Sequence, residues 1–158
     1  MPKQSAAVGD VFVVPLEDGT FGVGQVLEIA PSVLKNCFSC AFFEIRLSSE
    51  PGKLSSLDLT ERSALAYQFV TLDLFDSGIW KRVGNVAPRI PDDVLPHRGG
   101  KDIGWVGTKV IGSGIIRMLL NAYFGLRPWS EMHDPTYYDK LLIAGRRGPL
   151  NENRAKPV

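Results

Sequence analysis

The chain has 158 residues, of which 44% are hydrophobic and 22% are charged, and its formal net charge is +1. This length and composition fit one folded domain that buries roughly two-thirds of its unfolded surface, and they exclude a largely disordered chain. The balanced charge excludes a strong overall attraction to nucleic acid or to an anionic membrane surface. We therefore expect a single domain over residues 1–158, with loose ends at 1–8 and 146–158.

The sequence also indicates a compartment. Residues 1–10 contain no apolar run of the length that a secretion signal needs, and no segment approaches the roughly 20 apolar residues that cross a bilayer. The two cysteines are too few for a secreted domain that depends on disulfides. These features predict a cytoplasmic protein with no membrane partner.

The first predicted element is a β-hairpin that pairs residues 10–16 with residues 20–29. Both runs are apolar and β-branched, and Asp18-Gly19 between them is a strong turn signal, because glycine adopts a positive φ without steric cost. Gly22 and Gly24 within the second run indicate a bend, a bulge or the close approach of another backbone. Such early curvature favours a small barrel over a flat sheet.

Further strands are predicted after Pro31 ends this hairpin. Residues 41–47 alternate so that Phe43, Ile45 and Leu47 face the core and Glu44 and Arg46 face outward. Residues 54–65 permit a short helix. Residues 66–74 and 79–83 are predicted strands on either side of a tight turn at 76–78, and the prolines in 88–102 predict a long loop.

The last third of the chain is expected to be partly helical. Residues 104–111 form a candidate late strand, and Ser113 is the predicted N-cap of a helix over 114–124 that Gly125 ends. Asp134 and Pro135 predict the start of a second helix over 135–144, with a strand over 140–144 as the alternative. The expected fold class is α+β, with a curved antiparallel sheet or a small SH3-like barrel and a C-terminal helical element.

Two segments carry a family resemblance. The first joins the Gly-Asp-led run 9–16 to the glycine-bearing run 24–27, and the second is the run 72–85, which includes a Gly-x-Trp-x-x-x-Gly element. Together and in this order they resemble the Imm26-type immunity proteins of bacterial polymorphic toxin systems. The resemblance implies a protein that binds a cognate toxin domain, often a nuclease, and blocks it without catalysing a reaction. The residues from about 104 onward match no pattern of that family.

Four residues are candidates for contact with a partner: Asp76, Trp80, Asp92 and Asp93. A nuclease is basic where it holds phosphates, so an acidic rim on an inhibitor would complement it and speed their encounter. The structural interpretation of the same aspartates is a solvated loop of mixed charge. Tryptophan is enriched both in protein cores and at binding hot spots, and core packing is expected for at least two of Trp80, Trp105 and Trp129, with Trp80 half-buried.

Other motifs are expected to have no chemical role. Cys37 and Cys40 have the spacing of a zinc knuckle or a redox pair. A structural zinc site needs four ligands, and a redox pair is expected at the start of a helix. The sequence offers neither, so we expect two thiols without a chemical role. Residues 112–114 fit a helix start better than a phosphate-binding turn. His97 and His133 lie in loop-like segments without a nucleophile elbow. We expect no cofactor and no metal.

The leading hypothesis is therefore an immunity protein whose partner is a cognate toxin. The first alternative is a small barrel that binds nucleic acid or peptide through exposed aromatic side chains, with nucleic acid disfavoured by the balanced charge. The second alternative is an enzyme whose site is assembled from His97, His133 and loop aspartates. It predicts that the fold brings the two histidines into one concave pocket.

Overall fold

The computed structural model describes residues 4–29, 36–91 and 109–148. Its first element is the predicted hairpin, formed by β1 (Asp10–Pro15) and β2 (Phe21–Ile29), with Val13 opposite Val23. At the turn the Leu16 amide donates to the Thr20 carbonyl at 2.8 Å, and Gly19 has a φ of +85°. The Asp-Gly signal therefore placed this turn correctly, because the requirement for a positive φ is local.

Six strands form one sheet in the order β5-β1-β2-β3-β4-β6. The remaining strands are β3 (Cys37–Leu47), β4 (Ala64–Thr71), β5 (Lys81–Asn85) and β6 (Val110–Ile111). Every pairing is antiparallel except the short parallel pairing of β6 with β4. Register shifts interrupt the β1–β5, β2–β3 and β3–β4 pairings, and such bulges increase the local bend of a sheet.

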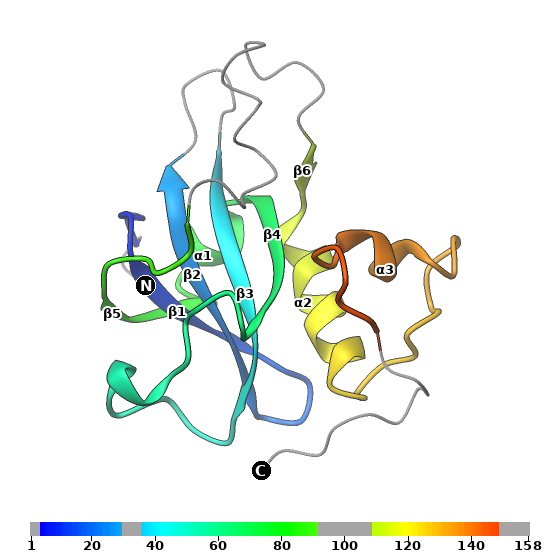
Figure 1. Cartoon of the computed structure of the whole chain (residues 1–158), viewed down its shortest axis with the longest axis horizontal. Coiled ribbons are helices and arrows are strands. Elements are labelled where there is room, and N and C mark those ends of the chain that lie inside the picture. Colours follow the sequence, from blue (N-terminus) through cyan, green and yellow to red (C-terminus); the bar gives the residue numbers. More distant parts are fainter. Residues whose placement is uncertain (1–3, 30–35, 92–108, 149–158) are drawn as a thin grey trace.

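The expected α+β class with a curved sheet is confirmed (Figure 1). The sheet formed by the described strands is open, with β5 and β6 at its edges, so the barrel alternative is not realised there. The helical elements are η1 (Leu54–Ser56), α1 (Asp73–Asp76), α2 (Ser113–Tyr123) and α3 (Tyr137–Leu141). Helices α2 and α3 follow all the described strands in the chain, whereas η1 and α1 lie between strands.

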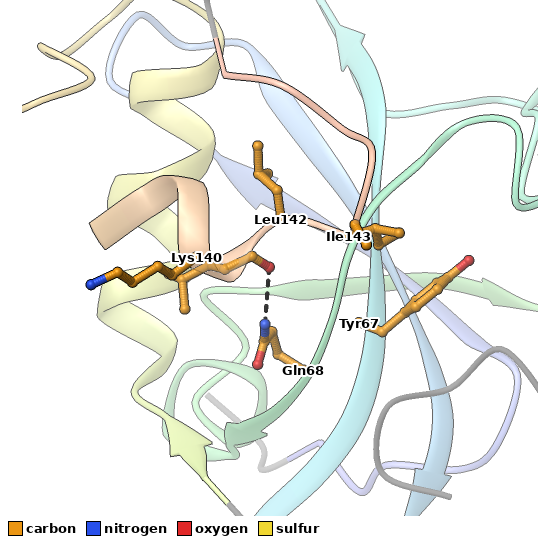
Figure 2. A pocket seen from close by; sticks show the side chains of 7 residues that line it. Tyr67, Gln68, Lys140, Leu142 and Ile143 are labelled. Atoms are coloured by element: carbon orange, nitrogen blue, oxygen red, sulfur yellow. Dashed lines mark hydrogen bonds between the residues drawn. The ribbon is translucent and has the colours of Figure 1, made fainter. Parts of the chain in front are cut away.

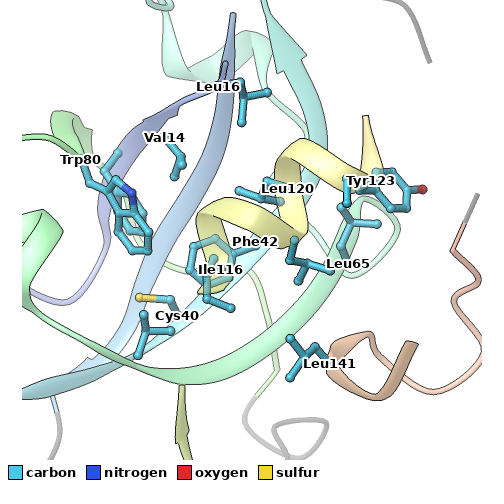
Figure 3. Packing of buried hydrophobic residues seen from close by; sticks show 14 of the residues in the cluster. Val14, Leu16, Cys40, Phe42, Leu65, Trp80, Ile116, Leu120, Tyr123 and Leu141 are labelled. Carbon is cyan, nitrogen blue, oxygen red and sulfur yellow. The ribbon is translucent and has the colours of Figure 1, made fainter. Parts of the chain in front are cut away.

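The larger core lies between one face of the sheet and the helices. Phe12, Phe38 and Phe42 from the strands meet Ile116 and Leu120 from α2, and all five side chains have 0% exposure. Figure 3 shows α2 lying across the concave side of the strands, with its apolar side chains directed at them. Burying aromatic and branched side chains is the main source of stability for such a face, at about 1.5–3 kcal/mol for each side chain.

A second, smaller core covers the opposite face. Its members alternate in sequence with those of the first, so that Val11 and Phe43 face it while their neighbours Phe12 and Phe42 face α2. Leu57 and Leu59, which follow η1, close this side. The expected inward placement of Phe43, Ile45 and Leu47 is confirmed, and it refers to this second core.

Helix α2 begins and ends for reasons that the sequence partly revealed. Gly125 has a φ of +83° and its amide donates to the Ala122 carbonyl, while the Leu126 amide reaches the Asn121 carbonyl at 2.8 Å. This is a Schellman end, as Gly125 predicted. The predicted N-cap is wrong: Ser113 is the first helical residue, Gly112 is the cap, and the Ser113 amide donates to the Thr71 hydroxyl at 2.9 Å.

Several predicted boundaries shift. The strand expected over 66–74 runs from Ala64 to Thr71, because α1 begins at Asp73 and uses the residues that follow. The strand expected over 79–83 is β5, two residues later. The second helix begins at Tyr137, and Asp134 instead bonds the Thr136 amide at 2.9 Å in the preceding turn. Most of the predicted 88–102 loop and of the 104–111 strand lie outside the described residues.

Candidate functional site

The two segments that carry the family resemblance are neighbours in the structure. Asp10 opens β1 and pairs with Asn85 of the edge strand β5. The Asp10 side chain is only 3% exposed, and its carboxylate accepts hydrogen bonds from the Ala7 amide at 2.8 Å and from the Asn85 side chain at 2.9 Å. The Arg82 guanidinium lies 3.3 Å from the same carboxylate. A buried charge is stable only when hydrogen bonds and opposite charges compensate it. Through these contacts Asp10 joins β1 to the edge strand β5.

At two positions of these segments, neighbouring atoms leave no room for a side chain and so require glycine. Gly9 has a φ of +92°, and a Cβ placed there would lie 2.5 Å from the Val86 carbonyl oxygen. A Cβ at Gly24 would lie 2.5 Å from Cζ of Phe12. The close approach at Gly24 is made by the aromatic side chains of Phe12 and Phe42, whereas the approach of another backbone was expected. Gly9 and Gly24 thus have a structural role in the sheet.

The structure describes two of the four predicted contact residues. Asp76 is partly exposed at the end of α1, where its carbonyl accepts a hydrogen bond from the Gln4 amide at 3.1 Å. The Gln4 side-chain amide also bonds the Phe75 and Trp80 carbonyls, each at 2.8 Å, so this turn is tied to the N-terminal segment. Asp92 and Asp93 lie outside the described residues.

Trp80 is not half-buried as expected. Its side chain is 0% exposed, and the indole ring stacks on Phe12 with the centroids 5.2 Å apart and the planes 8° apart. Phe42 meets the same ring edge-on at 5.8 Å. The indole N–H has no hydrogen-bond partner within the described ranges. Trp80 thus supports the surface from within and presents no area to a partner.

A charged cluster that the sequence did not reveal joins the hairpin turn to the C-terminal third. The Arg127 guanidinium contacts Glu17 at 2.7 Å and Glu131 at 2.6 Å, and the Tyr138 hydroxyl donates to Glu131 at 2.7 Å. The neighbouring Arg127 and Tyr138 lower the pKa of the Glu131 carboxyl. Burial, followed by the contact with Glu131, raises the pKa of Tyr138. We call Glu17, Arg127, Glu131 and Tyr138 the hairpin clasp.

Arg46 provides a second contact at the same end of the molecule. It was expected to face outward, but its side chain is 6% exposed. Its guanidinium pairs with Asp18, donates to the Thr20 hydroxyl at 3.1 Å and lies 5.7 Å from the centre of the Phe124 ring. Hydrogen bonds from Thr20 and the charge of Arg46 together lower the pKa of the Asp18 carboxyl. The outward face of strand β3 is thus covered here by the loop after α2.

The spacing of the clasp residues explains why they were missed. The Arg127 and Glu131 pair has a spacing of four residues, which is a recognised signal for a helical ion pair, but this segment is irregular. The contact with Glu17 spans 110 positions of the chain. No local pattern predicts such a contact.

The cysteines do not form a reactive pair. Cys37 and Cys40 are both buried and lie three positions apart on β3, so successive alternation directs them to opposite faces of the sheet. Burial raises the pKa of both thiols, which opposes formation of the thiolate that redox chemistry and zinc binding require. In the part of the chain that the structure describes, no three His, Cys, Asp or Glu residues gather as a metal would require.

The remaining candidates are the helix start at residues 112–114 and the two histidines. Ser113 donates to the Asp73 carboxylate at 2.7 Å, and Thr71 donates to the same oxygen at 2.6 Å, so the start of α2 is already occupied by a carboxylate of this chain. These hydroxyls lower the pKa of Asp73. His133 is exposed. His97 lies outside the described residues, and the predicted pairing of the two histidines stays a prediction.

Comparison with known proteins identifies a family. The family model described as Immunity protein 26 (Imm26) matches residues 7–99, which include β1 to β5 and both motif segments. No curated protein and no solved structure matches the chain. Among the helices described, none has the length and apolar character that crossing a membrane demands.

Proposed function

Because the chain belongs to the Immunity protein 26 family, we propose that it neutralises a cognate bacterial toxin domain by binding it and blocking its active site or substrate groove. The match over residues 7–99 is the observation that carries this proposal. We further propose that the protein acts in the cytoplasm, that the toxin is a nuclease, and that neutralisation involves no chemical reaction.

The role of the motif residues supports a binding function. Asp10 and Asn85 are joined by a hydrogen bond, and Gly9 and Gly24 are closely surrounded by backbone or side-chain atoms of neighbouring segments. A rigid platform of this kind loses little conformational entropy when a partner binds, which favours tight inhibition. Residues 109–148, beyond the matched segment, cover the sheet through α2 and α3. They add to the proposed platform a surface that lies outside the segment matched by the family model.

Three acidic residues are the proposed contacts: Asp76, Asp92 and Asp93. Asp76 is partly exposed on the turn after α1. Carboxylates there would complement the basic groove with which a nuclease holds phosphates. Trp80 is excluded from the contact set, because its side chain is fully buried.

The test is growth protection. The toxin domain encoded by an adjoining gene is expressed alone and together with this chain, and we expect growth only in the second case. Replacing Asp76, Asp92 and Asp93 together by lysine should reduce protection, whereas Asp58→Lys, at an exposed position after η1, should not. Absence of protection by the unmodified chain would overturn the proposal.

The nucleic-acid alternative is weakened by the placement of the aromatic side chains. A stacking platform needs exposed rings. Of the aromatic residues described, only Phe21 and Tyr137 are partly exposed, and the rest are buried. Titration with single-stranded oligonucleotides at low salt should therefore show no binding, and a strong, salt-sensitive signal would restore this alternative.

A further inference from the structure

Among the described residues, two segments form backbone hydrogen bonds with the outer edge of β4, one on each side of Tyr67. At one place the Ile143 amide donates to the Leu65 carbonyl at 2.8 Å. At the other, β6 pairs with Phe69 and Val70. Tyr67 lies between these two contacts, and no described residue pairs with its backbone on this side.

The register of the sheet shows which way the Tyr67 backbone points. The Leu72 amide donates to the Asn36 carbonyl at 2.9 Å, and the pairing continues without a shift through Val70 opposite Phe38 and Gln68 opposite Cys40. In an antiparallel pair, hydrogen-bonded and non-hydrogen-bonded positions alternate. The even-numbered residues of β4 therefore bond to β3. It follows that the Tyr67 amide and carbonyl are directed to the outer edge.

A pocket lies at this edge. Its volume is about 300 Å³. Its lining residues are Tyr67, Gln68, Lys140, Leu141, Leu142, Ile143 and Ala144 (Figure 2). The side-chain amide of Gln68 donates to the Leu141 carbonyl at 2.9 Å, which fixes one wall of the pocket against β4. The Lys140 ammonium is held by Asp134 at 2.6 Å, so the pocket has no unpaired cation to select an anion.

We propose that this edge, with its pocket, binds an extended peptide segment of the partner protein. One residue of the segment pairs with Tyr67 through both of its backbone groups, and an adjacent apolar side chain enters the pocket beside Leu142 and Ile143. The identity of the partner as a toxin rests on the proposed function.

Two observations favour an extended peptide over a small molecule. First, the Tyr67 amide and carbonyl offer one donor and one acceptor with the spacing found between paired strands. Peptides extend an exposed sheet edge by pairing with such groups. Second, no described residue pairs with the outward backbone groups of Tyr67, and unpaired groups at a sheet edge favour pairing with another strand. A peptide supplies both missing bonds at once.

The first experiment measures amide hydrogen exchange in the complex of the full chain with the toxin domain of the adjoining gene. In the free protein the Tyr67 amide should exchange faster than the Gln68 amide, because only the latter bonds to β3. On complex formation the Tyr67 amide should slow by about tenfold or more. An unchanged rate at Tyr67 in a formed complex would overturn the inference and leave the proposed function standing.

The second experiment fills the pocket. Ala144 lines it and is exposed, so Ala144→Trp should fold normally, and it should weaken toxin binding by about tenfold or more. Ala87→Trp is the matched control at an exposed position after β5, and its affinity should stay within about twofold. Equal affinity of both variants would contradict the inference, whereas no binding by the unmodified chain would overturn the proposed function itself.

Discussion

The Asn85 side chain donates a hydrogen bond of 2.9 Å to the buried Asp10 carboxylate, across a sequence separation of 75 positions. This contact joins the two segments by which the chain resembles its family. It stabilises the pairing of β1 with the edge strand β5, next to which the Gln4 side chain bonds the Trp80 carbonyl. The resemblance therefore reflects how the sheet is held together.

Removing this carboxylate should destabilise the fold. Asp10→Ala leaves the Ala7 amide and the Asn85 side chain without their buried acceptor, and we expect a loss of about 1–3 kcal/mol in the free energy of unfolding. In a double-mutant cycle with Asn85→Ala, measured by urea denaturation, the two losses should not add, because the residues share one contact. Additive losses would show that the hydrogen bond contributes nothing. Asp58→Ala, at an exposed site, is the control and should change stability by less than about 0.5 kcal/mol.

Two glycine substitutions should have opposite effects. Gly9→Ala places a Cβ 2.5 Å from the Val86 carbonyl at a φ of +92°, and the expected cost is about 1–3 kcal/mol. Gly114→Ala adds a methyl group in open space within α2, where alanine favours the helix by about 0.8–1 kcal/mol. Thermal unfolding of both variants checks the pair. A neutral Gly9→Ala variant would contradict the described backbone.

Trp80 should affect stability and not recognition. Trp80→Ala removes a fully buried ring that packs on Phe12 and Phe42, so we expect a loss of about 3–5 kcal/mol. Trp80→Phe should lose less, because a ring remains between these neighbours. Chemical denaturation measures the loss, and affinity for the toxin is then compared under conditions where each variant is folded. A folded Trp80→Phe variant with strongly reduced affinity would instead support a direct contact.

The hairpin clasp should weaken in acid. Arg127 and Tyr138 lower the pKa of Glu131 in the folded protein, so the stability that this carboxylate contributes is present above its unfolded pKa and is lost as the pH falls through the lower folded value. At neutral pH, Glu131→Gln should cost about 1–2 kcal/mol. The difference from the unmodified protein should shrink below about pH 4, as measured by urea denaturation across pH. A constant difference would show that the charge of Glu131 has no role.

Local signals predicted much of the strand-rich half. The hairpin followed from Asp18 and Gly19, because a two-sided apolar pattern and a positive φ are properties of neighbouring residues. Gly125 likewise predicted the end of α2. The N-cap of the same helix was wrong, because the Ser113 amide bonds Thr71, a residue of β4 far away in sequence.

The candidate site was much less accessible to prediction. Tryptophan is common both in cores and at binding surfaces, so the sequence could not decide the role of Trp80. Its burial depends on contacts with Phe12 and Phe42, which come from other strands. Arg46 alternates as a surface residue does, yet the loop after α2 covers it. Among the described residues, Tyr67 lies between the contacts that Ile143 and β6 make with β4, and both contacts join segments distant in sequence.

The sequence by itself determined the family, the curved sheet, the turn at Gly19 and the helix end at Gly125, since these depend on local conformational preference and on short recurring patterns. Only the tertiary structure decided which polar groups are buried, which ion pairs form between the hairpin and the C-terminal third, and which described segments pair with the edge of β4. These features arise from contacts between distant segments. Their free energy depends on solvent exclusion, which the folded arrangement alone creates.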